Sequence, residues 1–273
     1  MFKSKVFMPF AVLGDPNYEE SLKIIQGFVK NGAGALELGF AFSDPIADGP
    51  IIQKANNRAL ENGITTKKAF EIIEKVRKDT SIPISVMLSY NIVYNYGVEN
   101  FYKKCAELKV DGVLCPDVPL EEAEELIELS KKYKLAQIFI VSPTTTKERM
   151  GLLNKYASGY TYMVSLLGTT GVKTELNTQL PAMIKLCKKE MKLPLYVGFG
   201  ISKPEHAANV IKLGADGAIS GSAICKIVEE NLTNPKEMQA KINKFCKEMS
   251  EAVKNAWYFR SDSGEQKKGS FNF

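Results

Sequence analysis

The chain has 273 residues, of which 45% are hydrophobic and 25% charged, with 20 glycines and 12 prolines. This composition is that of a folded protein and excludes a disordered, collagenous or low-complexity chain. The 36 basic and 31 acidic residues give a net charge of +5 and are spread along the whole sequence. A weak, dispersed positive charge favours small anionic ligands over nucleic acid.

The five cysteines are widely separated and form no C-x-x-C pair, which argues against a disulfide framework and a zinc site. The single histidine, His206, argues against Ser/His/Asp catalysis and a multi-histidine metal site, and we expect it to be solvated at a helix start. No apolar stretch is long enough to span a membrane, and the first residues resemble neither a signal peptide nor a transit sequence. We therefore expect a cytoplasmic protein without a metal.

Short apolar segments rich in β-branched and aromatic residues predict eight strands. They are residues 6–13, 35–39, 84–89, 112–115, 136–141, 160–164, 195–198 and 217–220. Segments with apolar residues at spacings of three and four predict the helices between them. They are residues 18–31, 66–78, 99–108, 120–133, 147–156, 179–190 and 204–213. Strict alternation of strand and helix requires a parallel sheet, because each return to the same edge needs a crossover.

Eight such units can close a ring, so we assign the chain to the α/β class as a single-domain (β/α)8 TIM barrel. The interval after the second strand is the longest and contains an extended loop at 40–51 and an extra helix at 52–61. Loops that follow strands lie at the catalytic face of such barrels. Further helices are expected from Gly221 and over 236–256, so the barrel domain spans 1–260 and a polar, frayed tail spans 261–273.

Glu37 lies in the middle of the second expected strand, where Leu36, Leu38 and Phe40 form the face toward the helices. Glu37 then points into the barrel, where burial raises the pKa of a carboxyl by up to about 3 to 5 units. Such a group exchanges protons near neutral pH. The alternative is a structural glutamate paired with a lysine or bonded by backbone amides, but the adjoining strands carry no basic residue at that depth.

The loop at 42–50 carries two more acidic residues, Asp44 and Asp48. Pro45 and Pro50 restrict the backbone and Gly49 permits a tight turn, so the loop holds both carboxylates beside Glu37 in a preformed shape. For Asp48 the alternative is an ordinary turn or capping role, because Asp-Gly is a common turn dipeptide.

Glycine-rich segments at 197–202 and 219–223 follow the seventh and eighth expected strands. Glycines allow a ligand to approach the backbone, and amides at a helix start offer donors to an anion. Because phosphate sites recur after these two strands in barrels, we expect one here. The alternative is that both segments are ordinary turns.

A third glycine-containing segment, residues 166–172, follows the sixth expected strand and places two threonines between two glycines. This pattern predicts a mobile lid, in which the hydroxyl of Thr170 grips a carboxylate on the facing loop when the lid closes. The alternative is that the segment is only a flexible connector.

Several of these motifs occur in the order typical of one family. Residues 36–39 and 42–50, followed by Gln53 and Ala55, resemble the signature of the tryptophan synthase alpha chain family. The segment 111–119, the Thr170-Gly171 pair and both phosphate turns match as well. The resemblance extends over about residues 6–252, and the acidic loop is its most specific part.

The resemblance implies a lyase of tryptophan biosynthesis that cleaves indole-3-glycerol phosphate by a retro-aldol reaction into indole and glyceraldehyde 3-phosphate. Glu37 matches the family's acid–base residue, and Asp48 matches the carboxylate that accepts the indole N–H. Thr170 matches the lid threonine that bonds the loop aspartate, and Tyr162 a tyrosine beside the catalytic glutamate. The phosphate ligands implied are Gly171, Phe199, Gly200, Gly221 and Ser222. No metal or organic cofactor is implied for this chain.

The resemblance also implies a partner, the tryptophan synthase beta chain, in an alpha2beta2 heterotetramer. The beta chain carries pyridoxal phosphate and receives indole through an internal tunnel. The partner surface would comprise the two loops together with Asn95 and Pro119, with Asp44 and Pro45 as contacts. Free alpha chains of the family are poor catalysts, because the partner shifts the lid toward its closed state.

This sequence departs from the family pattern at three places. It begins almost at the first strand, so the usual helix across the bottom of the barrel is short or absent and something else is expected to cover that end. Ala41 stands where the family often has proline, and Leu166 and Leu167 make the lid more apolar. None of these changes falls on the expected acid, base or phosphate ligands.

Two other functions remain open at this stage. A different phosphate-binding barrel, such as a phosphosugar isomerase or synthase, explains the two glycine turns equally well but not an inward Glu37 coupled to Asp48. A non-catalytic subunit that only stimulates a partner would have no need of either carboxyl group.

Overall fold

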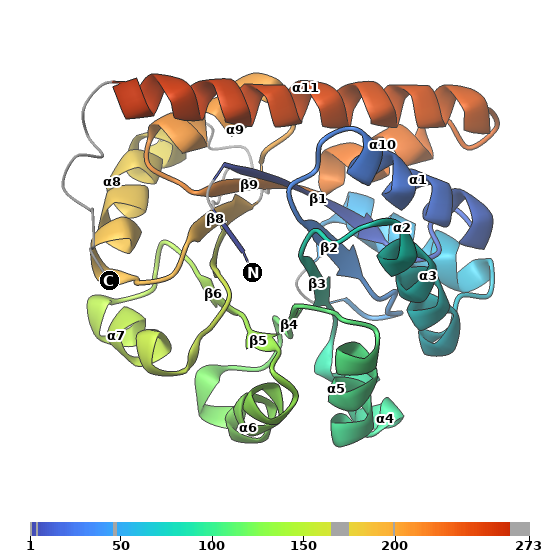
Figure 1. Cartoon of the computed structure of the whole chain (residues 1–273), viewed down its shortest axis with the longest axis horizontal. Coiled ribbons are helices and arrows are strands. Elements are labelled where there is room, and N and C mark those ends of the chain that lie inside the picture. The colour runs from blue at the N-terminus through green and yellow to red at the C-terminus, as the bar shows by residue number, and fades with distance from the viewer. Residues whose placement is uncertain (1, 4, 46–47, 165–174, 199, 263–273) are drawn as a thin grey trace.

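The structure is a computed structural model that describes residues 2–3, 5–45, 48–164, 175–198 and 200–262. Its strands form the centre of the molecule and its helices surround them, as Figure 1 shows. All strand pairs are parallel, and their order is β5-β4-β3-β2-β1-β9-β8-β7-β6. The predicted α/β barrel is therefore confirmed.

The strands agree with the predicted segments to within a residue or two at each end, except at the fifth position. They are β1 (Val6–Val12), β2 (Leu36–Gly39), β3 (Ile84–Met87), β4 (Gly112–Leu114), β5 (Ala136–Gln137), β6 (Phe139–Val141), β7 (Thr161–Val164), β8 (Leu195–Gly198) and β9 (Gly217–Ser220). The single strand expected at 136–141 is divided at Ile138, because β5 pairs with β4 whereas β6 pairs with β7. The two short strands together occupy one position of the ring.

The helices follow the predicted segments, with differences at 90–96, at 120–123, at 175–178 and after 256. They are α1 (Tyr18–Lys30), α2 (Pro50–Glu61), α3 (Thr66–Asp79), α4 (Tyr90–Tyr96), α5 (Val98–Glu107), α6 (Glu124–Tyr133), α7 (Lys147–Tyr156), α8 (Glu175–Glu190), α9 (Pro204–Lys212), α10 (Ser222–Glu229) and α11 (Pro235–Asp262). Helix α4 was not predicted, and a short 3-10 helix, η1 (Leu120–Glu122), precedes a shorter α6. Helix α11 extends past the expected end at 256 and includes the first two residues of the expected tail, 261–262.

Local sequence explains where several helices begin. The side chain of Asn17 accepts a hydrogen bond from the Glu20 amide at 3.0 Å, and Thr65 caps α3 in the same way. These caps satisfy amides that have no partner within the helix. The longest helix, α11, lies across the outside of the barrel against α1 and α9 (Figure 1). No helix in the described ranges is long and apolar enough to cross a membrane.

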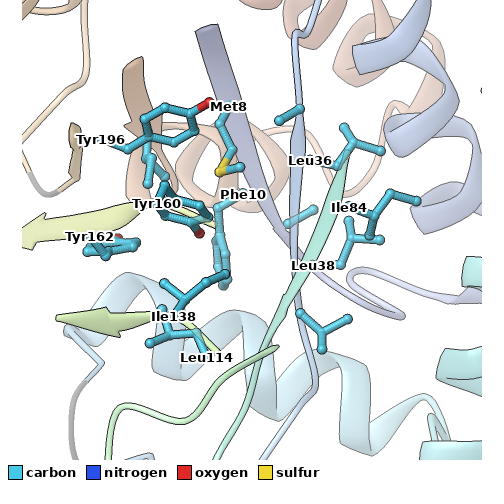
Figure 2. Packing of buried hydrophobic residues seen from close by; sticks show 14 of the residues in the cluster. Met8, Phe10, Leu36, Leu38, Ile84, Leu114, Ile138, Tyr160, Tyr162 and Tyr196 are labelled. Atoms are coloured by element: carbon cyan, nitrogen blue, oxygen red, sulfur yellow. The ribbon is translucent and has the colours of Figure 1, made fainter. Parts of the chain in front are cut away.

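The interior of the barrel is filled by aromatic and aliphatic side chains. Figure 2 shows Phe10, Tyr160 and Tyr162 together. Leu36 and Leu38 of β2 form a second group with Ile84 of β3. The two groups reflect the alternation of side chains along parallel strands. The leucines of β2 are fully buried against the helix layer, as the sequence predicts.

The end of the barrel where the strands begin is covered by the residues before β1. Phe2 is buried, and its ring lies 4.8 Å from that of Tyr160 and 6.2 Å from that of Tyr196, centre to centre. Tyr196 donates a hydrogen bond to the backbone oxygen of Lys3 at 2.7 Å, which holds this segment in place. An aromatic side chain thus covers the interior at the end where the sequence suggested that a helix is missing.

Candidate active site

Glu37 projects from β2 into the barrel interior and is only 1% exposed. Its strand neighbours in register are Phe10 and Ser85, neither of which carries a charge. Burial raises the pKa of Glu37 to about 8, against a smaller lowering by a hydrogen bond from the Tyr160 hydroxyl to Oε1 at 3.0 Å. The other carboxyl oxygen, Oε2, is buried and has no hydrogen-bond partner among the described residues. Glu37 therefore has one anchored oxygen and one available oxygen.

Asp48 lies on the loop before α2 and is held by two side chains of that helix. Asn56 donates to its Oδ2 at 3.0 Å, and Gln53 donates to its backbone oxygen at 2.7 Å. Burial raises the pKa of Asp48, and the hydrogen bond from Asn56 opposes that rise. Asp48 in turn raises the pKa of Glu37 through charge repulsion.

A cavity of about 310 Å³ opens between these carboxyl groups and the strand ends on the opposite side of the barrel. Its walls are largely apolar, with Phe10, Met87 and Ile140 among them. Six predicted site residues line it: Glu37, Asp48, Tyr162, Gly200, Gly221 and Ser222. Acidic groups, an apolar wall and two glycine turns are thus parts of one cavity.

The two turns at the far side of the cavity are joined to each other. The hydroxyl of Ser220 donates to the backbone oxygen of Ile201 at 2.5 Å, which links the end of β9 to the turn after β8. Gly200 has a φ of +73°, a conformation that favours glycine. Gly221 caps α10 without a side-chain hydrogen bond to its first amides. A helix start of this kind attracts an anion.

The ring of Phe10 lies between two glycines at the floor of the cavity. A Cβ atom at Gly39 would lie 2.7 Å from the Phe10 ring, and one at Gly221 would lie 2.9 Å from it. Real Cβ atoms do not approach other atoms so closely, so both positions require glycine for the ring to fit.

His206 is exposed, as expected, and it also contacts one of the two glycine turns. Its Nδ1 lies 3.0 Å from the backbone oxygen of Gly200. The histidine therefore supports the turn after β8 from outside the cavity.

Comparison with known proteins agrees with this geometry. Residues 2–254 match the family model for the tryptophan synthase alpha chain. The chain belongs to the tryptophan synthase alpha chain family. Tryptophan synthase alpha chains from Methanothermobacter thermautotrophicus and Francisella tularensis are each 46% identical to it, over 240 and 250 residues. These alignments cover 88% and 91% of this chain and 89% and 93% of the relatives.

Solved structures of the family have the same fold. In the tryptophan synthase α2β2 complex of Pyrococcus furiosus, a chain with 36% identity superposes with a TM-score of 0.85, covering 91% of this chain and 99% of that one. The alpha subunit from the same organism, at 35% identity, superposes with a TM-score of 0.84 and the same coverage.

The residues that the family resemblance assigns to a partner surface lie outside the cavity. Asp44 is exposed and accepts a hydrogen bond from Ser43, and Pro45 is half-buried beside it. Asn95 is exposed on α4 and donates to Asn91 at 2.7 Å, and Pro119 is exposed before η1. The described structure thus leaves three of the four largely accessible.

A second cavity, of about 360 Å³, adjoins the first and shares Phe10, Asp48, Met87 and Pro116 with it. It extends from the acidic end of the site to Asp44 and Pro45. The second cavity thus lies between the carboxyl group of Asp48 and the surface loop.

Some predicted site residues lie outside the described part of the chain. They are Thr170 and Gly171 of the expected lid, and Phe199 beside the turn after β8. The expected lid segment 166–172 lies there as well, together with residues 46–47 of the acidic loop.

Three side chains that support the site were not predicted: Tyr160, Ser85 and Asn56. Ser85 is a lone polar residue in the apolar strand β3, opposite Glu37 in register, and this contrast was the available signal. Asn56 lies eight residues after Asp48 and donates to its carboxylate from helix α2. This short spacing can be read from the sequence.

Within the described ranges, no three His, Cys, Asp or Glu side chains lie close enough to hold a metal ion.

Proposed function

We propose that the chain is a tryptophan synthase alpha subunit that cleaves indole-3-glycerol phosphate by a retro-aldol reaction into indole and glyceraldehyde 3-phosphate. The observation that carries this proposal is a single cavity with a proton-holding carboxyl, Glu37, at one end and two glycine turns at the other. Membership of the family supports the same reaction.

The reaction needs a proton at the indole carbon that loses its side chain. With a pKa of about 8, Glu37 is largely protonated at neutral pH and can donate that proton from its carboxyl group. The ring nitrogen then bears positive charge, and its N–H donates to the carboxylate of Asp48, which stabilises that charge.

The second half of the reaction breaks the carbon–carbon bond. The Glu37 carboxylate removes the proton from the side-chain hydroxyl next to the ring, the C–O bond becomes the aldehyde, and the electron pair of the broken bond returns to the ring. Indole and glyceraldehyde 3-phosphate result, and Glu37 regains the proton that it gave. The cycle balances without a metal or organic cofactor in this chain.

The phosphate of the substrate binds at the glycine turns. Amides at Gly200, Gly221 and Ser222 hold its oxygens, joined by Gly171 and Phe199 in the family pattern. Because this group does not react, its binding energy serves to orient the indole end against Glu37. Tyr162 borders the space between the two ends, and Thr170 bonds Asp48 when the lid closes.

The partner in this proposal is the tryptophan synthase beta chain, in an alpha2beta2 complex in the cytoplasm. Its surface contacts Asp44, Pro45, Asn95 and Pro119, and the beta chain, which carries pyridoxal phosphate, joins the indole to serine. The second cavity extends from the acidic end of the site to Asp44 and Pro45, which supports this side as the exit for indole. The five buried free thiols suit a reducing compartment.

The test is an assay of indole release from indole-3-glycerol phosphate by the purified chain, alone and with a cognate beta chain. We expect slow release alone and faster release in the complex. A panel of phosphosugars tests for an isomerase or synthase, and the Glu37→Gln variant tests for a subunit that only activates its partner. No indole under either condition would refute the proposal.

A further inference from the structure

Glu37 is the first member of a buried hydrogen-bond network that continues away from the cavity. Tyr160 donates to Glu37 Oε1 at 3.0 Å, and the Tyr160 hydroxyl lies 3.2 Å from Ser85 Oγ. Ser85 Oγ also lies 3.3 Å from the backbone oxygen of Leu36, to which it can donate. All three side chains are buried, so water does not compete for these bonds. We call Glu37, Tyr160, Ser85 and the Leu36 oxygen the Glu37 network.

The Tyr160 hydroxyl can donate to Glu37 Oε1 in both protonation states of the carboxyl group. When Glu37 is ionised, Ser85 donates to the Tyr160 oxygen and Tyr160 donates to the carboxylate. When Glu37 is protonated, the proton is on Oε2, Tyr160 still donates to Oε1, and Ser85 donates to the Tyr160 oxygen or to the Leu36 oxygen. Every hydroxyl has an acceptor in both states, because each can both give and accept a hydrogen bond.

We propose that Ser85 is a positioning residue that acts through Tyr160 on Glu37, by donating to the Tyr160 hydroxyl and so strengthening the hydrogen bond that Tyr160 gives to Glu37 Oε1. This role rests on the proposed function, in which Glu37 gives up a proton and recovers it once per turnover. The network holds Oε1 in both protonation states and leaves Oε2, which has no partner among the described residues, for the substrate.

Ser85 favours the ionised form of Glu37 more than the protonated form. Donation from Ser85 polarises the Tyr160 hydroxyl, and a polarised donor binds a carboxylate more strongly than a neutral acid. Without Ser85, Tyr160 still bonds either form, but the carboxylate loses this support. Removal of the serine hydroxyl therefore raises the pKa of Glu37.

The other titratable groups near Glu37 are not members of the network. Asp48 faces it from the loop before α2 and Tyr162 from β7, and the described strands place no cation against it. Their contributions to the pKa of Glu37 stay constant when only Ser85 or Tyr160 is changed. A pKa shift of Glu37 in such variants is therefore due to the network.

A matched control lies elsewhere in the same barrel. Ser130 and Tyr102 are buried and donate to Gln137 Oε1 at 3.0 and 2.9 Å, so they form a serine–tyrosine pair on an acceptor that does not titrate. Ser130→Ala and Tyr102→Phe remove the same atoms from a similar environment without contact with Glu37.

The experiment measures the pKa of Glu37 directly in the full chain, from the infrared band of its protonated carboxyl, assigned by its loss in Glu37→Gln. We expect Ser85→Ala to raise this pKa by about half a unit, a threefold change in the ionisation constant, and Tyr160→Phe to raise it by about one unit. The double variant should match Tyr160→Phe alone, because Ser85 acts only through Tyr160. Ser85→Thr keeps a hydroxyl and should restore the original value.

The two control variants, Ser130→Ala and Tyr102→Phe, should leave the pKa of Glu37 unchanged. An unchanged pKa in Ser85→Ala, or a further rise in the double variant beyond Tyr160→Phe, would overturn the proposal. If Ser85→Ala does not fold, Ser85→Cys replaces the hydroxyl by a weaker donor of similar shape, and a smaller rise in the same direction is expected. Because the infrared titration needs no substrate, it tests the network separately from indole release, whose absence would refute the proposed function instead.

Discussion

Asp48 and Glu37 border the same cavity from a loop and a strand, and the charge of Asp48 raises the pKa of Glu37. In the proposed reaction, Glu37 is held in its protonated form while the Asp48 carboxylate accepts a hydrogen bond from the substrate. Repulsion between neighbouring carboxyl groups commonly separates the roles of acid and base in this way.

The first prediction concerns Asp48→Asn. Loss of the negative charge should lower the pKa of Glu37 below its value of about 8, and loss of the acceptor for the indole N–H should lower kcat by about 100-fold or more. Infrared titration and the rate of indole release measure the two effects. Asp79→Asn serves as the control, because Asp79 is an exposed carboxylate that accepts a hydrogen bond from Gln26. It should change neither the pKa of Glu37 nor the rate of indole release. An Asp48→Asn variant with unchanged Glu37 pKa would show that the two groups are not coupled.

The second prediction concerns stability. The pKa of Glu37 is about 8 in the folded state and near the ordinary value of 4.5 in the unfolded state, so only the unfolded state loses this proton at intermediate pH. The contribution of Glu37 to stability is complete below about pH 4.5 and is lost as the pH rises through about 8. Glu37→Gln removes this dependence.

Chemical denaturation at several pH values measures the effect. The free energy of unfolding of the Gln variant, relative to the original chain, should increase by a few kcal/mol between about pH 5 and pH 8, since each pKa unit corresponds to about 1.4 kcal/mol. The same variant should lose indole release by about 1,000-fold or more. A difference in stability that does not change with pH would contradict the raised pKa.

The third prediction tests the close approach of Phe10 to Gly221. Gly221→Ala places a Cβ 2.9 Å from the Phe10 ring, so the ring or the turn must move and the phosphate amides move with it. We expect KM for indole-3-glycerol phosphate to rise by about tenfold or more, with a smaller change in kcat. Gly151→Ala is the matched control, because its Cβ meets no atom within 4 Å and it lies inside helix α7. Equal KM values in the two variants would exclude this role of Gly221.

The barrel and the direction of Glu37 could be predicted from the sequence because both follow from local patterns. Eight apolar segments alternate with amphipathic ones, and leucines on both sides of Glu37 determine which face of β2 packs on the helices. The division at Ile138 could not be predicted, because the apolar segment 136–141 is continuous and only the change of pairing partner divides it. Helix α4 was missed because it is short and rich in tyrosine and asparagine, which favour helices weakly.

The supporting residues of the site depend on contacts between distant parts of the chain. Ser85 lies in β3 and Tyr160 directly precedes β7, and their meeting with Glu37 depends on strand register and on the closure of the barrel. Neither the strand register nor the closure of the barrel can be read from a single sequence. The two glycine turns were easier to predict, since glycines at the ends of two successive strands are a local feature.

The fourth prediction concerns Phe2, which covers the interior beneath Tyr160. Phe2→Ala should lower the free energy of unfolding by about 3 kcal/mol, because it leaves a cavity among aromatic rings that are otherwise buried. Since Tyr160 donates to Glu37, looser packing of its ring should also raise the pKa of Glu37. Leu152→Ala, at a side chain that is 42% exposed on α7, is the control and should cost less than about 1 kcal/mol. Denaturation and infrared titration of both variants measure these effects, and a Phe2→Ala chain as stable as the control would mean that the residues before β1 do not cover the barrel in solution.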